Sequence, residues 1–209
     1  MYRKKREDIV YWLGDSLYLN ITNQCSNKCY FCFRHFWDGI SGFRLKLSRE
    51  PTAEEIIEEL KEHISRRRWN EIVFCGFGEP TSRLDCLLKV TKWIKKYHPF
   101  LKVRLNTNGQ APLLNPGRDV VAELKSAGVD VVSVSLNGHD EETYNRVCRP
   151  EFKEAYKSII NFIQALKNAN IDVEITALNL PEIDISKIRN FAERINTKFR
   201  LREPLPLVY

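Results

Sequence analysis

The sequence predicts an α/β fold in which parallel strands form a partial (βα)6 barrel of the TIM type. Apolar strands alternate six times with amphipathic helices along the 209 residues, and this order is typical of a parallel sheet with right-handed crossovers. A complete eight-unit barrel takes about 250 residues. We therefore expect an open barrel and a single domain over residues 1–209. A flat, doubly wound sheet is the structural alternative.

The predicted elements follow from apolar spacing and from helix-capping residues. Thr52 and Glu55 form a capping box ahead of the first helix, and Gly128 ends the third. The predicted strands are residues 17–22, 71–75, 101–106, 129–136, 171–178 and 199–202. The predicted helices begin near residues 52 and 82 and then cover 117–127, 151–169 and 184–196. A long loop, to about residue 49, follows the first strand.

Most of these strands alternate apolar with polar residues. In the third strand, Val103 and Leu105 alternate with Arg104 and Asn106. Successive residues of a strand face opposite sides of the sheet. One face therefore packs under the helices, and the other forms a polar concavity suited to a large polar ligand. The alternative remains open that charges such as Arg104 and Glu174 neutralise each other at the barrel floor.

Three of the six cysteines lie within eight residues, directly after the first strand. Cys25, Cys29 and Cys32 have the spacing C-x3-C-x2-C, and the carboxyl ends of parallel strands are where α/β enzymes place their chemistry. Three thiolates on one loop can hold an iron–sulfur cluster. A four-iron cluster would keep one iron without a cysteine, which suits binding of a substrate or cofactor there.

A zinc site is the alternative for this loop. Cys25, Cys29, Cys32 and His35 could form a closed Cys3His site in a zinc-stabilised module that binds nucleic acid. Structural zinc sites generally draw their ligands from two separated segments, which favours the cluster. The scattered cysteines Cys75, Cys86 and Cys148 are expected to be packed, reduced thiols, with Cys148 on a loop.

The motif C-x3-C-x-aromatic-C, with Phe31 as the aromatic residue, resembles the signature of the radical S-adenosylmethionine (SAM) superfamily. The resemblance covers most of the chain. It implies a [4Fe–4S] cluster on Cys25, Cys29 and Cys32, with SAM at the remaining iron. It also implies an enzyme that cleaves SAM reductively to a 5′-deoxyadenosyl radical, which abstracts hydrogen from its substrate.

Longer segments narrow the resemblance within the superfamily. LNITNQCSNKCYFC, FCGFGEPT and SVSLNGHDEETY resemble the TatD-family-associated radical SAM proteins most. They resemble the glycyl-radical-enzyme activases and the 7-carboxy-7-deazaguanine synthases less closely. The substrate implied is an unidentified small polar molecule or a partner protein.

The turn Gly76-Phe77-Gly78-Glu79 after the second strand resembles the glycine-rich GGE motif of that superfamily. Phe77 departs from the motif. The resemblance implies that Gly76, Phe77, Gly78 and Glu79 hold the SAM amino group. Glycines allow backbone to approach a ligand closely, and a carboxylate suits an ammonium group.

Further SAM contacts are implied at the ends of later strands. Ser135 and Asn137 end the fourth strand and resemble ribose-contacting residues, and Asn108 after the third strand is a second candidate. Leu180, after the fifth strand, is assigned to adenine. Each polar residue can equally be a turn or cap residue. No residue is identified for proton transfer.

Composition and charge suggest partners and location. The chain carries 33 basic and 27 acidic residues, a net charge of +6. It contains no apolar run of membrane-spanning length, and its basic first residues without an apolar stretch behind them lead us to expect no signal peptide. We expect a cytoplasmic protein without membrane contact. The clusters 3–6 and 66–68 are expected to be surface rather than a nucleic-acid site. The positive charge suits an acidic flavodoxin- or ferredoxin-like electron donor.

The inward strand positions also suggest the charge of the substrate. Lys102, Arg104, Arg200 and Arg202 lie on the polar face of their predicted strands. Cations on this face suit a polar, anionic substrate.

Overall fold

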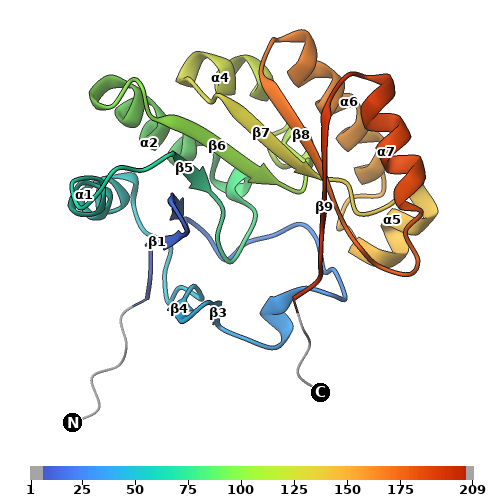
Figure 1. The fold of residues 1–209 in the computed structure, drawn as a ribbon, viewed down its shortest axis with the longest axis horizontal. Coiled ribbons are helices and arrows are strands. Elements are labelled where there is room, and N and C mark those ends of the chain that lie inside the picture. Colours follow the sequence, from blue (N-terminus) through green and yellow to red (C-terminus); the bar gives the residue numbers. More distant parts are fainter. Residues whose placement is uncertain (1–6, 206–209) are drawn as a thin grey trace.

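Seven strands form the main sheet in the computed structural model, which describes residues 7–205. Their order is β1 (Val10–Leu13), β2 (Ser16–Leu19), β5 (Glu71–Phe74), β6 (Lys102–Thr107), β7 (Val131–Ser135), β8 (Asp172–Leu178) and β9 (Lys198–Arg202). β1 is antiparallel to β2, and every other neighbouring pair is parallel. The sheet curves into a partial barrel that is open between β1 and β9 (Figure 1). The predicted fold class is confirmed.

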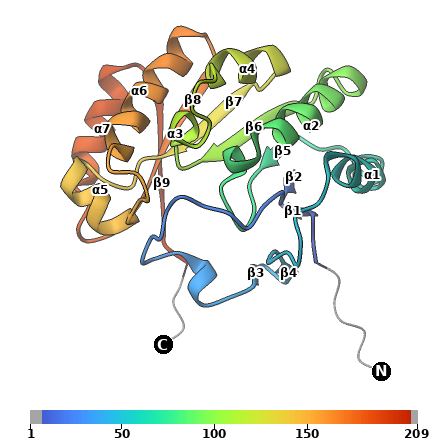
Figure 2. The same cartoon turned by 180° about the vertical axis from the view of Figure 1, so that it is seen from behind.

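Helices cover the convex outer face of this sheet, and Figures 1 and 2 show them side by side around it. They are α1 (Ala53–Ile64), α2 (Leu84–Tyr97), α4 (Val120–Ala127), α6 (Ala155–Asn168) and α7 (Ile185–Arg194). The predicted capping box is present, because Thr52 Oγ1 accepts from Glu55 N while the Glu55 carboxylate accepts from Thr52 N. Gly128 ends α4 with a φ of +95°, a conformation that glycine adopts without strain.

The apolar residues of the strands face these helices and form the core. Leu105, Val132 and Ile175 on three neighbouring strands are fully buried against apolar helix residues such as Leu87 and Ile163. Each such side chain contributes about 1.5–3 kcal/mol when it is buried. The same alternation leaves the polar residues of the strands on the concave face.

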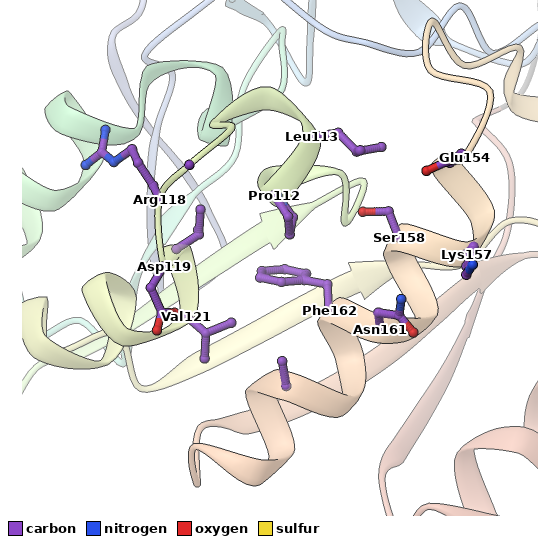
Figure 3. Close-up of a pocket in the computed structure, with 13 residues that line it drawn as sticks. Pro112, Leu113, Arg118, Asp119, Val121, Glu154, Lys157, Ser158, Asn161 and Phe162 are labelled. Carbon is purple, nitrogen blue, oxygen red and sulfur yellow. The ribbon is translucent and has the colours of Figure 1, made fainter.

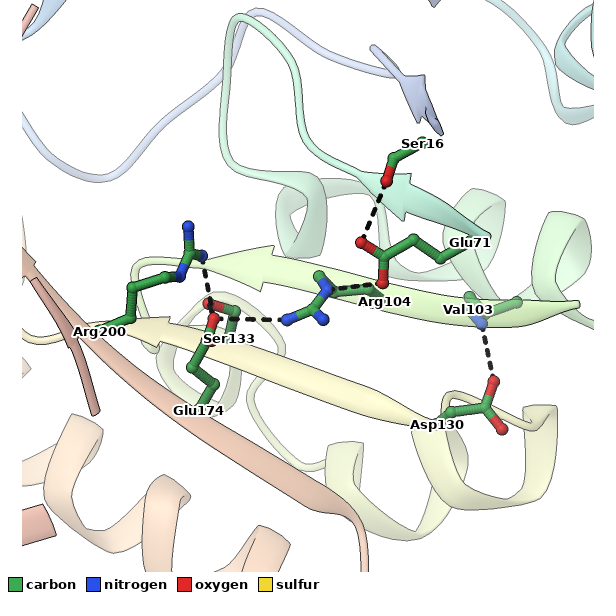
Figure 4. Close-up of polar contacts among 8 residues, drawn as sticks. All are labelled: Ser16, Glu71, Val103, Arg104, Asp130, Ser133, Glu174 and Arg200. Atoms are coloured by element: carbon green, nitrogen blue, oxygen red, sulfur yellow. Dashed lines mark hydrogen bonds and ion pairs between the residues drawn. The ribbon is translucent and has the colours of Figure 1, made fainter. Parts of the chain in front are cut away.

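The charges on the concave face neutralise one another near the barrel floor (Figure 4). Arg104 lies between two carboxylates, with Nε 2.9 Å from Glu71 Oε2 and Nη1 3.3 Å from Glu174 Oε2. Arg200 Nη2 lies 2.9 Å from the same Glu174 oxygen, and Ser133 Oγ donates to that oxygen at 2.9 Å. Arg104 and Arg200 therefore have partners within the protein, as the alternative prediction held.

Several short elements depart from the prediction. β1, the hairpin of β3 (Gly39–Ile40) and β4 (Phe43–Arg44), the short helix α3 (Ala111–Leu114) and the helix α5 (Glu141–Cys148) were not predicted. Cys148 was expected on a loop but ends α5. These elements are two to eight residues long, too short to show a clear period. Within residues 7–205, no helix combines the length and apolarity needed to cross a membrane.

Candidate functional site

The cysteine loop, residues 23–35, leaves the carboxyl end of β2 and crosses the open side of the barrel (Figure 2). Backbone hydrogen bonds join it to segments far along the chain. Glu79 N donates to Gln24 O at 2.6 Å, and Gly78 N donates at 2.8 Å to the carbonyl oxygen of Thr22, the residue that precedes the loop. On the other side, Lys28 N donates to Cys148 O at 3.1 Å. The loop is thus fixed between the glycine-rich turn and the end of α5.

The two glycines of the glycine-rich turn permit this close contact. A Cβ on Gly78 would lie 2.3 Å from Gln24 O, and a Cβ on Gly76 would lie 2.2 Å from Asn20 Oδ1. Neither glycine has a positive φ. The sequence suggested that these glycines make room for a ligand, whereas the structure places the chain's own backbone and Asn20 against them.

The carboxylate of Glu79 is buried and hydrogen-bonded within the protein. Oε1 accepts from Thr81 N, Thr81 Oγ1 and Thr107 Oγ1 at 3.0, 2.7 and 2.8 Å, and Oε2 accepts from Asn108 N at 2.6 Å. Burial raises the pKa of this carboxyl above its usual value, against these four hydrogen bonds. Glu79 therefore joins the glycine-rich turn to the end of β6. Its Oε1 accepts three hydrogen bonds and its Oε2 only one of those four.

The three cysteines of the loop share one cation, Arg34. Its Nε donates to Cys32 Sγ at 3.2 Å, and its guanidinium interacts electrostatically with Cys25 and Cys29 as well. The remaining nitrogens hold the loop backbone, with Nη1 3.1 Å from Asn23 O. A cation at this position offsets the negative charge that thiolate ligands bring to one site.

The thiols differ in their surroundings. Burial, and secondly the Glu79 carboxylate, raise the pKa of Cys25 to about 12. A hydrogen bond from the Cys148 thiol lowers the pKa of Cys29. Cys148 follows Cys29 by 119 positions, so its place beside the loop had no signal in the sequence. The described cysteines are all free thiols.

A buried polar cluster supports the loop from below. Gln110 Nε2 donates to Asn27 Oδ1 at 2.6 Å and to Tyr144 Oη at 2.9 Å, and Asn27 Nδ2 donates to the same hydroxyl at 3.0 Å. The Tyr144 hydroxyl also interacts with the Cys148 thiol. The sequence did not predict a supporting role for any of these residues. It did not predict one for Arg34 either, although a cation two residues after Cys32 could have indicated a contact with the cysteines.

The predicted SAM contacts near the loop are brought together. Asn108 Nδ2 donates to Ser26 Oγ at 2.9 Å and lies 4.0 Å from Cys25 Sγ. The ring of Phe77 lies 5.7 Å from the guanidinium of Arg34, and Phe31 packs against the edge of the core. Asn108 and Phe77 thus lie beside residues of the cysteine loop, and their contact with SAM stays a prediction.

The predicted contacts on later strands are engaged elsewhere. Ser135 Oγ accepts from Arg202 Nη2 at 3.3 Å. Asn137 Oδ1 accepts from Leu178 N at 3.0 Å and so joins the ends of β7 and β8. Leu180 is buried in the apolar core. Their assignment to SAM stays a prediction.

The zinc alternative is not supported. His35 Nε2 lies 3.0 Å from the carbonyl oxygen of Cys29, and within residues 7–205 no three His, Cys, Asp or Glu side chains are placed to hold one metal ion. A single zinc ion needs four ligands around one point, whereas a cubane cluster takes its three cysteines on three different irons. The basic cluster 3–6 lies outside the described residues. In the other cluster, Arg67 stacks on Trp69 at 4.0 Å.

Comparison with known proteins identifies the family. The family model of the radical SAM superfamily matches residues 19–195. The chain belongs to the radical SAM superfamily. Membership of this family implies a [4Fe–4S] cluster and SAM as cofactors. The closer resemblance to TatD-associated members stays a prediction.

The curated relatives of this radical SAM chain include probable GTP 3′,8-cyclases. The one from Thermococcus kodakarensis is 29% identical over 189 residues, which is 90% of this chain and 56% of the relative. The one from Thermoplasma volcanium is 30% identical over 180 residues, 85% of this chain and 49% of the relative. The chain thus spans about half the length of these relatives.

Solved structures share the radical SAM fold. The chain superimposes on Streptococcus suis SuiB bound to its precursor peptide SuiA with a TM-score of 0.70 and 14% identity, over 94% of this chain and 40% of SuiB. It superimposes on native anSMEcpe with bound AdoMet with a TM-score of 0.65 and 18% identity, over 92% of this chain and 52% of that one. At these identities the likeness shows the fold alone.

The residues of the cysteine loop fit an iron–sulfur cluster. Three soft thiol donors lie on one loop beside a cation, and a hydrogen-bonded glycine-rich turn adjoins them. A separate groove of about 790 Å³ lies on the outer surface between the α3–α4 segment and α6 (Figure 3). Pro112, Phe162 and Lys157 line it. It contains none of the predicted site residues.

Proposed function

We propose that Cys25, Cys29 and Cys32 hold the [4Fe–4S] cluster of this chain and that the adjoining turn Gly76–Glu79 binds SAM. When bound, the cluster and SAM supply the 5′-deoxyadenosyl radical that abstracts a hydrogen atom from the substrate. The carrying observation is the pair of hydrogen bonds from Gly78 N and Glu79 N to residues 22 and 24. These two bonds hold the glycine-rich turn directly against the cysteine loop.

The chain's own residues orient these groups and limit access of water. Arg34 offsets the charge of the thiolates and braces the loop through Asn23 O. The rings of Phe33 and Phe77 meet edge to face, with their centroids 5.6 Å apart, beside the loop. Glu79 and Asn108 join the turn to β6, so the SAM side of the site is a rigid unit. Such a shielded site protects a radical from side reactions with solvent.

Anaerobic reconstitution with iron and sulfide tests this proposal. We expect about four irons per chain, a brown protein, and release of 5′-deoxyadenosine and methionine after reduction with SAM present. Cys29→Ser should lose iron and cleavage. Cys86→Ser is the matched control, because Cys86 is buried on α2, away from the loop. A colourless chain with one tightly bound zinc, or a Cys29→Ser variant that cleaves SAM, contradicts the proposal.

The reaction named for the curated relatives is a second candidate. The 29% identity to a probable GTP 3′,8-cyclase extends over 90% of this chain and supports it. The test is incubation of the reconstituted protein with GTP, SAM and a reductant. Consumption of GTP that depends on SAM supports this candidate, and 5′-deoxyadenosine release without loss of GTP contradicts it.

A flavodoxin- or ferredoxin-like protein is proposed as the electron donor, in the cytoplasm. The net charge of +6 favours an acidic partner, and six unpaired cysteines are consistent with a reducing compartment. Electron transfer from such a donor should slow as salt is raised, because salt screens charge attraction. A rate independent of salt contradicts charge-guided docking.

A further inference from the structure

Arg202, at the end of β9, faces the barrel interior without a carboxylate partner among residues 7–205. It lies on the same face of β9 as Arg200, because alternate residues of a strand share a face. Of the five N–H donors of the guanidinium, Nη2 donates to Ser135 Oγ at 3.3 Å. Nε is buried and has no partner. Arg202 is therefore a largely unsatisfied cation.

The charged layer at the barrel floor cannot supply the missing partner. Glu71 and Glu174 are the carboxylates of this layer, and Arg104 and Arg200 already balance them one for one (Figure 4). The charge of Arg202 is additional to this balanced set. A partly buried charge without a counter-ion is unfavourable, and burial lowers the pKa of Arg202 accordingly.

An unsatisfied acceptor lies in the same part of the barrel. Asn106 Oδ1, on β6, is buried without a hydrogen-bond partner. Cys75, directly before the glycine-rich turn, accepts a hydrogen bond from the Asn106 side chain and interacts electrostatically with Arg202. These residues end β5, β6 and β9, beside the turn assigned to SAM. Buried polar groups in folded proteins normally have partners, so a bound molecule is expected to complete this set.

We propose that Arg202, oriented by its hydrogen bond to Ser135, binds an oxyanion of the substrate inside the barrel, while Asn106 accepts a hydrogen bond from a neighbouring hydroxyl or amino group. This inference rests on the proposed function, which puts the radical chemistry at the adjoining turn. The planar guanidinium matches a carboxylate or a phosphate in two-point contact. The substrate class is thus a small polar molecule, or a chain end, with an oxyanion beside a hydrogen-bond donor.

Titration calorimetry with two probes tests the inference on reconstituted, SAM-loaded protein. Lactate offers a carboxylate beside a hydroxyl, and glycerol 3-phosphate offers a phosphate near one. We expect one-to-one binding of at least one probe, weakened about tenfold or more in Arg202→Gln, since truncating a buried charge contact typically costs at least that much. Arg202→Lys keeps the charge without the two-point contact and should give an intermediate loss. The preferred probe identifies the oxyanion.

Lys198→Gln is the matched control. Lys198 lies on the same strand, is exposed, and its replacement removes the same charge. Equal weakening in Lys198→Gln and Arg202→Gln, or no binding of either probe to the unmodified chain, overturns the inference. So does a loss of SAM binding in Arg202→Gln with probe binding unchanged, because Arg202 would then serve the cofactor. Iron content and 5′-deoxyadenosine release are measured on the same preparation. A failure of these two measurements contradicts the proposed function, whereas a failure of probe binding alone contradicts only the role of Arg202.

Discussion

Replacing Gly78 with alanine should push the cysteine loop away from the glycine-rich turn. The backbone of Gly78 has no positive φ, so alanine is conformationally acceptable there. The added Cβ, however, would lie 2.3 Å from Gln24 O and 2.7 Å from Asn23 C. Both are backbone atoms of the cysteine loop, which cannot rotate away as a flexible side chain would. The loop itself must move.

The size of the effect follows from the contacts that this movement breaks. Gly78 N→Thr22 O and Glu79 N→Gln24 O are lost or lengthened, at about 1 kcal/mol each. Residual overpacking adds about 1–3 kcal/mol. A total of about 3–5 kcal/mol corresponds to a fall in Tm of about 6–20 °C in a domain of this size.

Thermal unfolding followed by circular dichroism, with iron content measured in parallel, tests this prediction. Gly14→Ala is the matched control, because Gly14 has a φ of +57° and nothing within 4 Å of an added Cβ. It should lower stability by about 1–2 kcal/mol through backbone strain alone and leave iron loading intact. The reasoning is refuted if Gly78→Ala unfolds at the same temperature as Gly14→Ala and retains a full complement of iron.

Three further predictions concern the supporting residues. Arg104→Met should lower the free energy of unfolding by about 2–4 kcal/mol in urea titrations, because it leaves the partly buried Glu71 carboxylate without an ion-pair partner and removes one of the two cations beside Glu174. Lys89→Met at an exposed pair should cost less than about 1 kcal/mol, and equal losses would contradict this reasoning. Tyr144→Phe removes the acceptor of two amide donors, so we expect a loss of about 1–3 kcal/mol and faster release of iron to a chelator, and unchanged release would count against it. Burial raises the pKa of Glu79, so the folded chain binds this proton more tightly than the unfolded chain. The stability of wild type relative to Glu79→Gln should therefore rise as pH falls from the raised pKa of the folded chain toward the usual glutamate pKa, and a pH-independent difference would exclude this linkage.

Local patterns in the sequence were sufficient to predict the parallel sheet and its helices. The capping pair Thr52 and Glu55 marked the start of α1, and the alternation of Val103 with Arg104 separated the core face of β6 from its polar face. These signals depend on residues within a few positions of each other. Strand and helix boundaries consequently agree to within a few residues.

The support of the site depends on contacts that no local pattern encodes. Tyr144 and Cys148 lie on α5, more than a hundred residues after the cysteine loop that they contact. Glu79 shows a different limit. The motif suggests an acid that contacts a ligand, but it does not show that Thr81, Thr107 and Asn108 also hydrogen-bond the oxygens of this acid. Two of these three residues lie on another strand end, so only the tertiary structure reveals the contacts.

The three cysteines are equivalent in the motif and unequal in the fold. Cys25 is partly buried and interacts electrostatically with Glu79, Cys29 accepts a hydrogen bond from the Cys148 thiol, and Cys32 accepts one from Arg34. Hydrogen bonds to sulfur and nearby charge set the reduction potential of an iron–sulfur cluster. Two of these three influences come from residues outside the cysteine motif that are distant in the sequence, and the third, Arg34, lies just after it. The motif therefore specifies which cluster can bind, whereas the surrounding fold determines how readily that cluster accepts an electron.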